Sequence, residues 1–278
     1  MSTKAKHLAA KPNKPHKQKS RTPVIIAIVT VIVIALLILF LFTPVLDGLK
    51  PGKQLHLKIG HSKFDYPPLH YYDNGKLVGF DIELAQAAAE IMGAEIEFVP
   101  INWSEAAEAL ESGDVDMLWG GLERASLDEQ IVKFTKSYLQ ANIVLLMPGD
   151  RDYSKLQDLQ GLSICALNFT PAFSYLQAYN RDVIKSKRSF TPPEYQALLN
   201  SLSSGEFDCM ITDINFASFF LKQNSGESYA MSDVVIGASY AIGVLADEPK
   251  LFDRLQSALD ELQANGTVDT LREKWIGS

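Results

Sequence analysis

The segment WSEAAEALESGDVDML, residues 103–118, is followed 92 residues later by YQALLNSLSSGEFDCM, residues 195–210. Each copy starts at an aromatic residue, continues as an amphipathic helix, and passes through Ser-Gly and an acid into an apolar strand. Gly113 and Gly205 suit the position just after a helix, where a positive φ is needed. A period of this length is too long for a solenoid repeat and fits one lobe of a larger fold. The pattern therefore predicts two similar α/β lobes, with a ligand cleft between them at the carboxyl ends of their strands.

The residues around the first copy alternate between strand and helix patterns. Asp81 can cap a helix that ends at Met92. Ser126 and Glu129 have the spacing of a capping box, which predicts the start of another helix. Strands joined by helices form parallel βαβ units, so the fold class is α/β. The other predicted elements are strands at 55–59, 95–99 and 115–119 and a helix at 104–111.

Composition excludes several classes of protein. Of the 278 residues, 47% are hydrophobic and 21% are charged, which is ordinary for a globular chain. Residues 1–46 hold seven basic and no acidic side chains, so the rest has 19 basic against 33 acidic groups. An acidic body argues against non-specific nucleic-acid binding. Cys165 and Cys209 are too few for a disulfide scaffold or a Cys-based zinc site, and we expect both to be reduced and buried. We expect no metal and no cofactor.

An uncharged segment near the N-terminus predicts a membrane anchor. Residues 24–42 contain no charged side chain, and their helix would be about 28 Å long, close to the ~30 Å hydrocarbon core. The alternative is a cleaved secretory signal, whose apolar stretch is usually only about 7–15 residues. Basic residues stay on the cytoplasmic side. The prediction is a single-pass protein of the cell membrane, its binding domain extracellular or periplasmic. Its parts would be a cytoplasmic tail at 1–22, an anchor at 23–43 and a linker at 44–54.

From about Leu55 to Trp275 the chain resembles the extracellular solute-binding proteins of the polar amino-acid ABC importer family. The resemblance rests on the order and spacing of several short motifs. It implies a two-lobed, periplasmic-binding-protein-like (Venus flytrap) fold whose chain crosses twice between lobes. The motifs are DYPPL at 65–69, NGKLVGFD at 74–81, SGDVD at 112–116, LQDLQG at 156–161, DCMITD at 208–213, NGT at 265–267 and KWIG at 274–277. The implied partition is 55–141 for the first part of lobe 1, 142–238 for lobe 2, and 239–278 for the return to lobe 1.

The resemblance also implies ligand contacts. Asp213 matches an aspartate that meets the ligand ammonium, and it can cap the following helix at the same time. Tyr66 and Trp103 match aromatic residues that cover the ligand, and Thr170 matches a hydroxyl contact. A buried ligand charge needs a charged partner in the protein.

At the positions where the family binds the carboxylate of the ligand, this sequence departs from the family pattern. Asp128 stands where the family has an arginine, and Glu123 stands where it has a small hydroxyl residue. Arg124 can supply the missing positive charge or pair with Glu123 at the surface. The ligand is therefore either amino-acid-like or cationic and polyamine-like. The predicted ligand-binding residues are Tyr66, Trp103, Gly121, Glu123, Arg124, Asp128, Thr170 and Asp213.

The resemblance implies a non-enzymatic receptor that delivers a small polar solute to an ABC permease. One alternative is a ligand-sensing ectodomain that acts through a separate signalling partner. Another is a dehydratase of the same fold, which would need an acid in the loop at 168–172. That loop reads NFTPA and has none.

Overall fold

The computed structural model describes residues 55–168, 170–178, 186–190, 195–226 and 228–277. They belong to one compact unit, Gln54–Ser278. The predicted tail, anchor and linker lie outside the described residues. Within those residues, no helix is long and apolar enough to cross a membrane.

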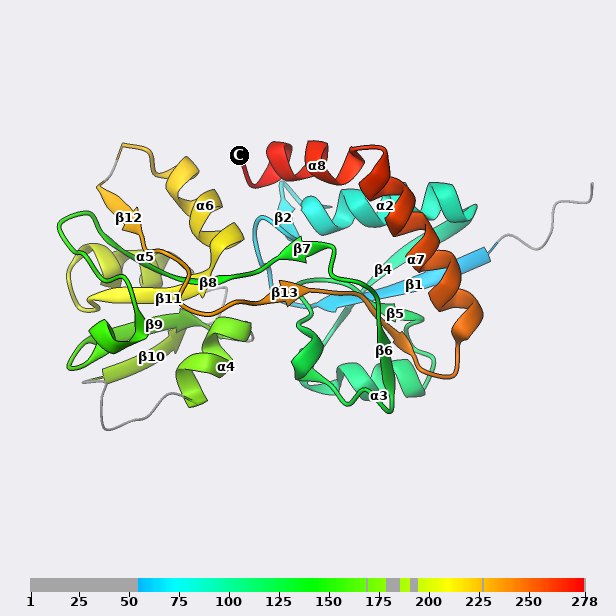
Figure 1. Cartoon of the computed structure of the whole chain (residues 1–278), viewed down its shortest axis with the longest axis horizontal. Helices are drawn as coiled ribbons and strands as arrows, with labels where there is room; N and C mark the ends of the chain where they lie inside the picture. The colour runs from blue at the N-terminus through cyan, green and yellow to red at the C-terminus, as the bar shows by residue number, and fades with distance from the viewer. Residues whose placement is uncertain (1–54, 169, 179–185, 191–194, 227, 278) are drawn as a thin grey trace, which may run out of the picture. The chain divides into compact units, whose positions relative to one another are not determined.

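The first lobe is built on a five-stranded sheet in the order β4-β1-β5-β14-β6 (Figure 1). β1 pairs in parallel with β4 and β5, and β14 runs antiparallel to β5 and β6. Helices α2, α7 and α8 pack together on one face of this sheet, and α3 lies on the other. The elements are β1 (Leu55–Ser62), β4 (Ala94–Ile101), β5 (Met117–Leu118), β6 (Val132–Phe134), β14 (Gly243–Leu245), α2 (Phe80–Met92), α3 (Ala106–Glu111), α7 (Pro249–Ala264) and α8 (Thr267–Trp275), with the hairpin β2 (Tyr71–Asp73) and β3 (Lys76–Val78) and the 3-10 turns Trp103–Glu105 and Arg124–Ser126.

The second lobe repeats this arrangement with the strand order β10-β9-β11-β8-β12. β9 pairs in parallel with β10 and β11, as β1 does with β4 and β5, and β8 runs antiparallel to β11, as β14 does to β5. The elements are β8 (Ile143–Pro148), β9 (Ser163–Leu167), β10 (Ser186–Phe190), β11 (Cys209–Asp213), β12 (Tyr229–Met231), α4 (Pro171–Ala178), α5 (Tyr195–Ser203) and α6 (Ile214–Gln223), with a 3-10 turn at Leu156–Leu159.

Two strands connect the lobes. β7 (Leu139–Gln140) leads the chain out of the first sheet, and β13 (Ser239–Tyr240) brings it back (Figure 1). They pair antiparallel, with Ser239 opposite Gln140 and Tyr240 opposite Leu139. The two lobes are thus joined by a double-stranded connection.

The sequence repeat has a structural counterpart in both lobes. Gly113 and Gly205 have φ angles of 75° and 74° after α3 and α5. Asp116 Oδ2 accepts a hydrogen bond of 2.7 Å from the backbone N–H of Lys58 in β1. Asp208 Oδ2 accepts one of 2.9 Å from Ser163 in β9. Each copy therefore contains an aspartate, just before its apolar strand, that hydrogen-bonds to the backbone of β1 or β9 in its own lobe, which supports the prediction of two similar lobes.

Several local predictions were wrong. Asp81 does not cap α2: Gly79 is the N-cap, and the Asp81 side chain is buried and accepts from Gly121 N–H at 3.2 Å. The strand predicted at 115–119 is limited to Met117–Leu118. No helix follows Ser126, whose hydroxyl donates to Glu123 O at 2.5 Å instead. In the first and last cases, contacts with other backbone groups take precedence over the local capping pattern.

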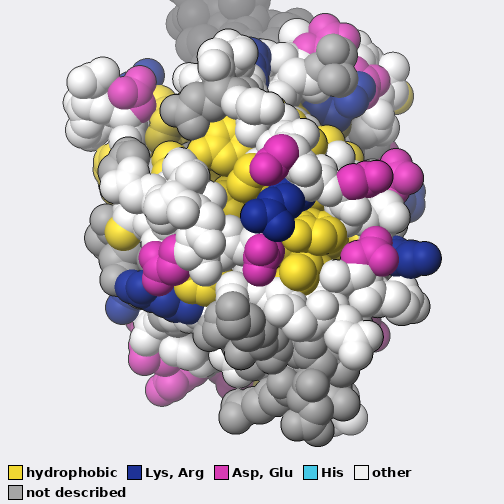
Figure 2. Space-filling model, turned by 90° about the vertical axis from the view of Figure 1, so that its left-hand side faces the viewer, with side chains coloured by type: hydrophobic (Ala, Val, Ile, Leu, Met, Phe, Trp, Pro, Cys, Tyr) yellow, Lys and Arg dark blue, Asp and Glu magenta, His cyan; other side chains and the backbone are white. Residues whose placement is uncertain are grey.

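The surface charge of the second lobe is locally balanced on the face seen in Figure 2, where acidic and basic side chains are interspersed among hydrophobic ones. The Arg151 guanidinium, for example, lies 3.6 Å from a carboxylate oxygen of Asp150 and 3.6 Å from one of Asp208.

In the interior of this lobe, Cys165 and Cys209 are both buried and free, as predicted. Burial raises the pKa of the Cys165 thiol to about 12, so it stays protonated at neutral pH.

Candidate functional site

A cavity of about 400 Å³ lies between the two lobes. A narrow hollow of about 10 Å³ adjoins it and extends toward Tyr66 and His70. That hollow has room for about one water molecule, whereas the larger cavity has the size of a small-molecule site. The cavity is lined by Trp103, Gly121, Glu123 and Ser126 of the first lobe and by Thr170, Pro171, Ser174, Tyr175 and Ala178 of the second.

Gly121 lies where the two spaces meet and lines both. Its φ is +70°, and a Cβ at this position would lie 3.4 Å from the ring of Tyr66, so a glycine suits both the backbone and the space. Its N–H donates to Asp81 Oδ2. The buried carboxylate of α2 thereby holds the loop that forms this wall.

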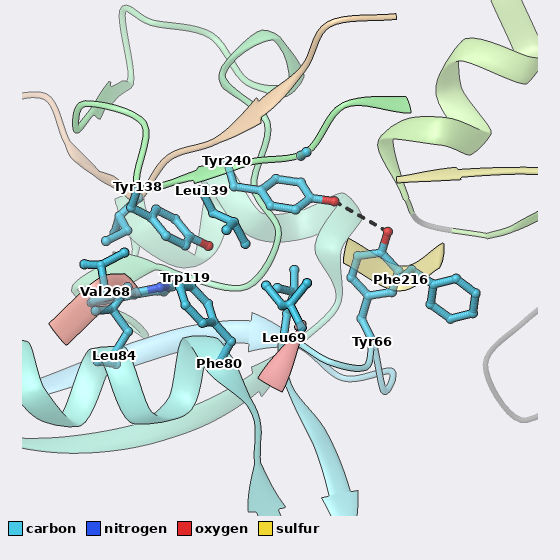
Figure 3. Close-up of a cluster of buried hydrophobic side chains, with 14 of the residues drawn as sticks. Tyr66, Leu69, Phe80, Leu84, Trp119, Tyr138, Leu139, Phe216, Tyr240 and Val268 are labelled. Atoms are coloured by element: carbon cyan, nitrogen blue, oxygen red, sulfur yellow. Dashed lines mark hydrogen bonds between the residues drawn. The ribbon is translucent and has the colours of Figure 1, made fainter. Parts of the chain in front are cut away.

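Tyr66 and Asp213 form a hydrogen bond between the lobes. The Tyr66 hydroxyl donates to Asp213 Oδ2. The same hydroxyl lies 3.5 Å from the hydroxyl of Tyr240, and the Tyr66 ring stacks on Phe216 with centroids 6.2 Å apart (Figure 3). Asp213 Oδ1 accepts from the N–H groups of Asn215 at 2.9 Å and Phe216 at 3.2 Å, so it caps α6. Asp213 is 1% exposed and does not line the cavity. The capping role is observed, and the predicted role as ammonium anchor stays a prediction.

A second tyrosine–carboxylate hydrogen bond also joins the lobes, but here the tyrosine belongs to the second lobe and the carboxylate to the first. The Tyr175 hydroxyl of α4 donates to Glu123 Oε1 at 2.7 Å. The backbone of Glu123 forms a β-bridge with Tyr240, which anchors it to the connecting strand β13. Partial burial, followed by the nearby Glu123, raises the pKa of Tyr175 to about 12, so the hydroxyl remains a donor. Both groups line the large cavity.

Arg124 and Asp128 lie away from the cavity. Arg124 is exposed, and its Nη2 donates to the carbonyl of Thr135 at 3.0 Å rather than pairing with Glu123. Asp128 is exposed in the turn before β6, where Oδ1 accepts from Gln130 N–H at 2.8 Å. Among the described residues that line the cavity, none is basic.

Two buried histidines lie beside the narrow hollow. His61 and His70 have ring centroids 5.3 Å apart. Burial, reinforced by the neighbouring His61, lowers the pKa of His70 to about 3, and burial also lowers that of His61. Both rings are therefore neutral at pH 7 and supply no positive charge. Across the described part of the chain, no three His, Cys, Asp or Glu side chains are grouped to hold a metal ion.

Behind the site, three buried polar atoms have no hydrogen-bond partner among the described residues: Asp81 Oδ1, Trp119 Nε1 and Tyr138 Oη. Burial raises the pKa of Asp81 to about 7, although the nearby Tyr138, the Gly121 N–H and Trp119 oppose this shift. The rings of Trp119 and Tyr138 pack around this point within the hydrophobic core of the first lobe (Figure 3).

Residues 57–278 match the model of the bacterial extracellular solute-binding proteins, family 3. The chain belongs to this family. The arginine-binding extracellular protein ArtP of Bacillus subtilis (strain 168) is 25% identical over 216 residues, covering 76% of this chain and 83% of that protein. A probable histidine-binding protein of Campylobacter jejuni is 28% identical over 227 residues, covering 80% and 85%. The structure of an ancestral arginine-binding protein bound to arginine matches with a TM-score of 0.69 at 28% identity, covering 81% of this chain and all of that one.

Membership confirms the resemblance predicted from the sequence, and the matched structure confirms the two-lobed α/β fold. Of the eight residues predicted to contact ligand, the structure places four on the wall of the large cavity and a fifth, Tyr66, on the adjoining hollow. The four are Trp103, Gly121, Glu123 and Thr170.

Sequence reasoning missed the contribution of α4. Pro171, Ser174, Tyr175 and Ala178 all line the cavity, and they are spaced i, i+3, i+4, i+7. That spacing places them on one face of the helix. The signal was present in the sequence, but without the fold nothing showed that this face meets Glu123 of the other lobe.

Proposed function

We propose that this family 3 protein captures a small polar solute, amino-acid-like or cationic, in the cavity between its lobes and delivers it to an ABC importer. The observation that supports the proposal most directly is the cavity itself. Its wall combines Trp103, Gly121 and Glu123 from the first lobe with Thr170 and Tyr175 from the second. The lobes of the proposal comprise 55–141 with 239–278, and 142–238.

A ligand in this position would touch both lobes at once, and this is how binding can be coupled to closure. A ligand shifts the open–closed equilibrium only by its difference in affinity for the two states. A ligand that contacts both lobes binds the closed state more tightly than the open state, because the open cleft offers it the contacts of only one lobe. The two connecting strands β7 and β13 are the natural hinge for such a motion.

The proposal is tested by thermal shift with a panel of amino acids and their amine analogues. A ligand that binds only the native form stabilises it by about 2.7 kcal/mol at 100 times its Kd. We expect at least one compound to raise the melting temperature in a concentration-dependent way. Trp103→Ala, which removes a cavity wall, should abolish the shift without lowering the melting temperature of the unliganded protein by a comparable amount. The absence of any shift across the panel would contradict the proposal.

We further propose that residues 23–43 anchor the protein in the cell membrane, with the tail at 1–22 in the cytoplasm and the binding unit outside. The uncharged run at 24–42 supports this, as does the basic tail before it. Expression of the full chain followed by alkaline carbonate extraction tests the anchor. The protein should remain with the membranes and keep its leader by mass spectrometry, and a mature N-terminus beyond Phe42 would contradict the anchor.

A further inference from the structure

We infer that the cavity selects an organic cation that carries no carboxylate, with Glu123 as the group that binds its positive charge. This inference rests on the proposed function, because it concerns the ligand of the same cavity. It departs from the amino-acid ligands named for ArtP and the ancestral arginine-binding protein.

The charge of the cavity wall is the first observation. Glu123 is the one charged side chain among the described residues that line the 400 Å³ cavity. The adjoining hollow adds Asp65 and the neutral His70. Arg124 is directed to the Thr135 carbonyl and does not line either space. A ligand carboxylate enclosed here would lose its hydration beside an acidic group with no cation to replace it, which is strongly unfavourable.

The geometry of Glu123 is the second observation. Its Oε1 is held by the Tyr175 hydroxyl, and its backbone is held by Tyr240. Its other oxygen, Oε2, has no hydrogen-bond partner among the described residues. The side chain is half-buried, so one oxygen is fixed and the other is available to a ligand in the cavity. A fixed carboxylate oxygen forms a short, charge-assisted hydrogen bond with an ammonium or guanidinium group.

The remaining walls suit the rest of such a ligand. Trp103 lines the same cavity and can place its ring against a cation. Pro171 and Ala178 contribute apolar surface on the α4 side. This combination accommodates a cationic head beside Glu123 and a methylene chain along α4.

The test compares ligands that differ only in the carboxylate. Isothermal titration of the unaltered protein is carried out with agmatine against arginine, and with cadaverine against lysine. We expect each decarboxylated amine to bind at least about tenfold more tightly than its amino acid, because a buried, unpaired carboxylate is penalised. This comparison needs no variant and is decisive even if a substitution at the site affects folding.

Matched variants then test the role of Glu123. Glu123→Gln keeps the shape and the acceptor for Tyr175 but removes the charge, so agmatine affinity should fall at least about tenfold. Glu129→Gln makes the same change at an exposed carboxylate outside the cavity and should leave agmatine affinity within about twofold.

The outcomes separate this inference from the proposed function. If arginine or lysine binds as tightly as its amine, the inference is overturned while the proposed solute-binding function stands. If the amines bind more tightly than the amino acids but Glu123→Gln has no effect on their affinity, Glu123 does not bind the positive charge of the ligand, and that part of the inference is overturned. If none of the four compounds binds, the inference fails, and the broader panel of the thermal-shift experiment decides the proposed function separately.

Discussion

Two tyrosine–carboxylate contacts join the lobes, and they differ in their access to solvent. Tyr66 of the first lobe donates to Asp213 of the second, where both side chains are buried. Tyr175 of the second lobe donates to Glu123 of the first, where both are half-buried on the cavity wall. Both oxygens of Asp213 accept hydrogen bonds from the protein, whereas one oxygen of Glu123 has no hydrogen-bond partner among the residues that the structure describes. The Tyr66–Asp213 hydrogen bond therefore stabilises the structure, whereas the Tyr175–Glu123 hydrogen bond leaves one carboxylate oxygen available to a ligand.

Burial is the physical reason for the difference. A buried carboxylate needs all its hydrogen bonds from the protein, because water cannot replace a lost partner. For a carboxylate on a cavity wall, water or a ligand can replace a hydrogen-bond partner that is lost. Disrupting the buried Tyr66–Asp213 contact should therefore cost much more folding stability than disrupting the half-buried Tyr175–Glu123 contact.

The largest effect should come from pH acting on Asp81, the buried carboxylate behind the site. Its pKa is raised from 3.8 to about 7, so between these values the folded protein holds a proton that the unfolded chain has released. Stability from this group is present below pH 4 and is lost as pH rises toward 7, by about 1.4 kcal/mol per unit or roughly 4 kcal/mol in all.

His70, with its pKa lowered to about 3, acts in the opposite sense over much of the same range. The measurement is therefore the difference in unfolding free energy between the wild type and Asp81→Asn, by urea titration at several pH values. This difference should fall as pH rises from about 4 to 7. Glu90→Gln, an exposed carboxylate of the same helix, is the control. A pH-independent difference for Asp81→Asn would contradict the raised pKa.

Asp213→Ala should have the next largest effect. It removes the cap of α6, worth about 1 kcal/mol, and leaves the buried Tyr66 hydroxyl with only the distant hydroxyl of Tyr240, at 3.5 Å, as acceptor, which costs roughly 1–3 kcal/mol more. Chemical denaturation should show a loss of about 2–4 kcal/mol. Asp213→Asn keeps a capping oxygen and should lose less. A change below about 1 kcal/mol for the alanine variant would show that this contact does not stabilise the fold.

Tyr66→Phe should be milder, because α6 keeps its cap. The variant leaves Asp213 Oδ2 buried without a donor, at a cost of about 1–3 kcal/mol. Equilibrium unfolding in urea measures the loss. The Tyr66 ring remains stacked on Phe216, so the change isolates the hydroxyl.

Tyr175→Phe should have the smallest effect on stability, below about 1 kcal/mol, since solvent can reach Glu123 once the hydroxyl is gone. The same urea titration provides the direct comparison with Tyr66→Phe. Equal losses for the two variants would remove the distinction between a structural and an accessible contact.

The parts of the fold that were predicted correctly rest on local patterns. The repeat around Gly113 and Gly205 was recognisable because a positive φ after a helix and an apolar strand are written in neighbouring residues. Asp81 and Ser126 were misassigned by the same local rules. Their partners, Gly121 and the Glu123 carbonyl, were not part of the capping pattern used to predict them.

The candidate site was predicted only in part for a related reason. Trp103, Glu123 and Thr170 were identified from their positions in the family pattern, and all three line the cavity. Counting along the chain also assigned Asp128 to the site, but the chain turns toward β6 there and leaves this side chain exposed.

The sequence by itself determined the two-lobed α/β architecture, the family and four of the residues on the cavity wall, but not the face of α4. These follow from hydrophobic periodicity, turn glycines and motif spacing, which act over a few residues each. Only the tertiary structure decided which carboxylate is enclosed and which is accessible. Asp213 and Glu123 meet tyrosines 147 and 52 residues away in the chain, and the burial of each pair depends on how the lobes pack. Burial sets the energetic role of a charged group, and it is a property of the assembled fold rather than of any segment.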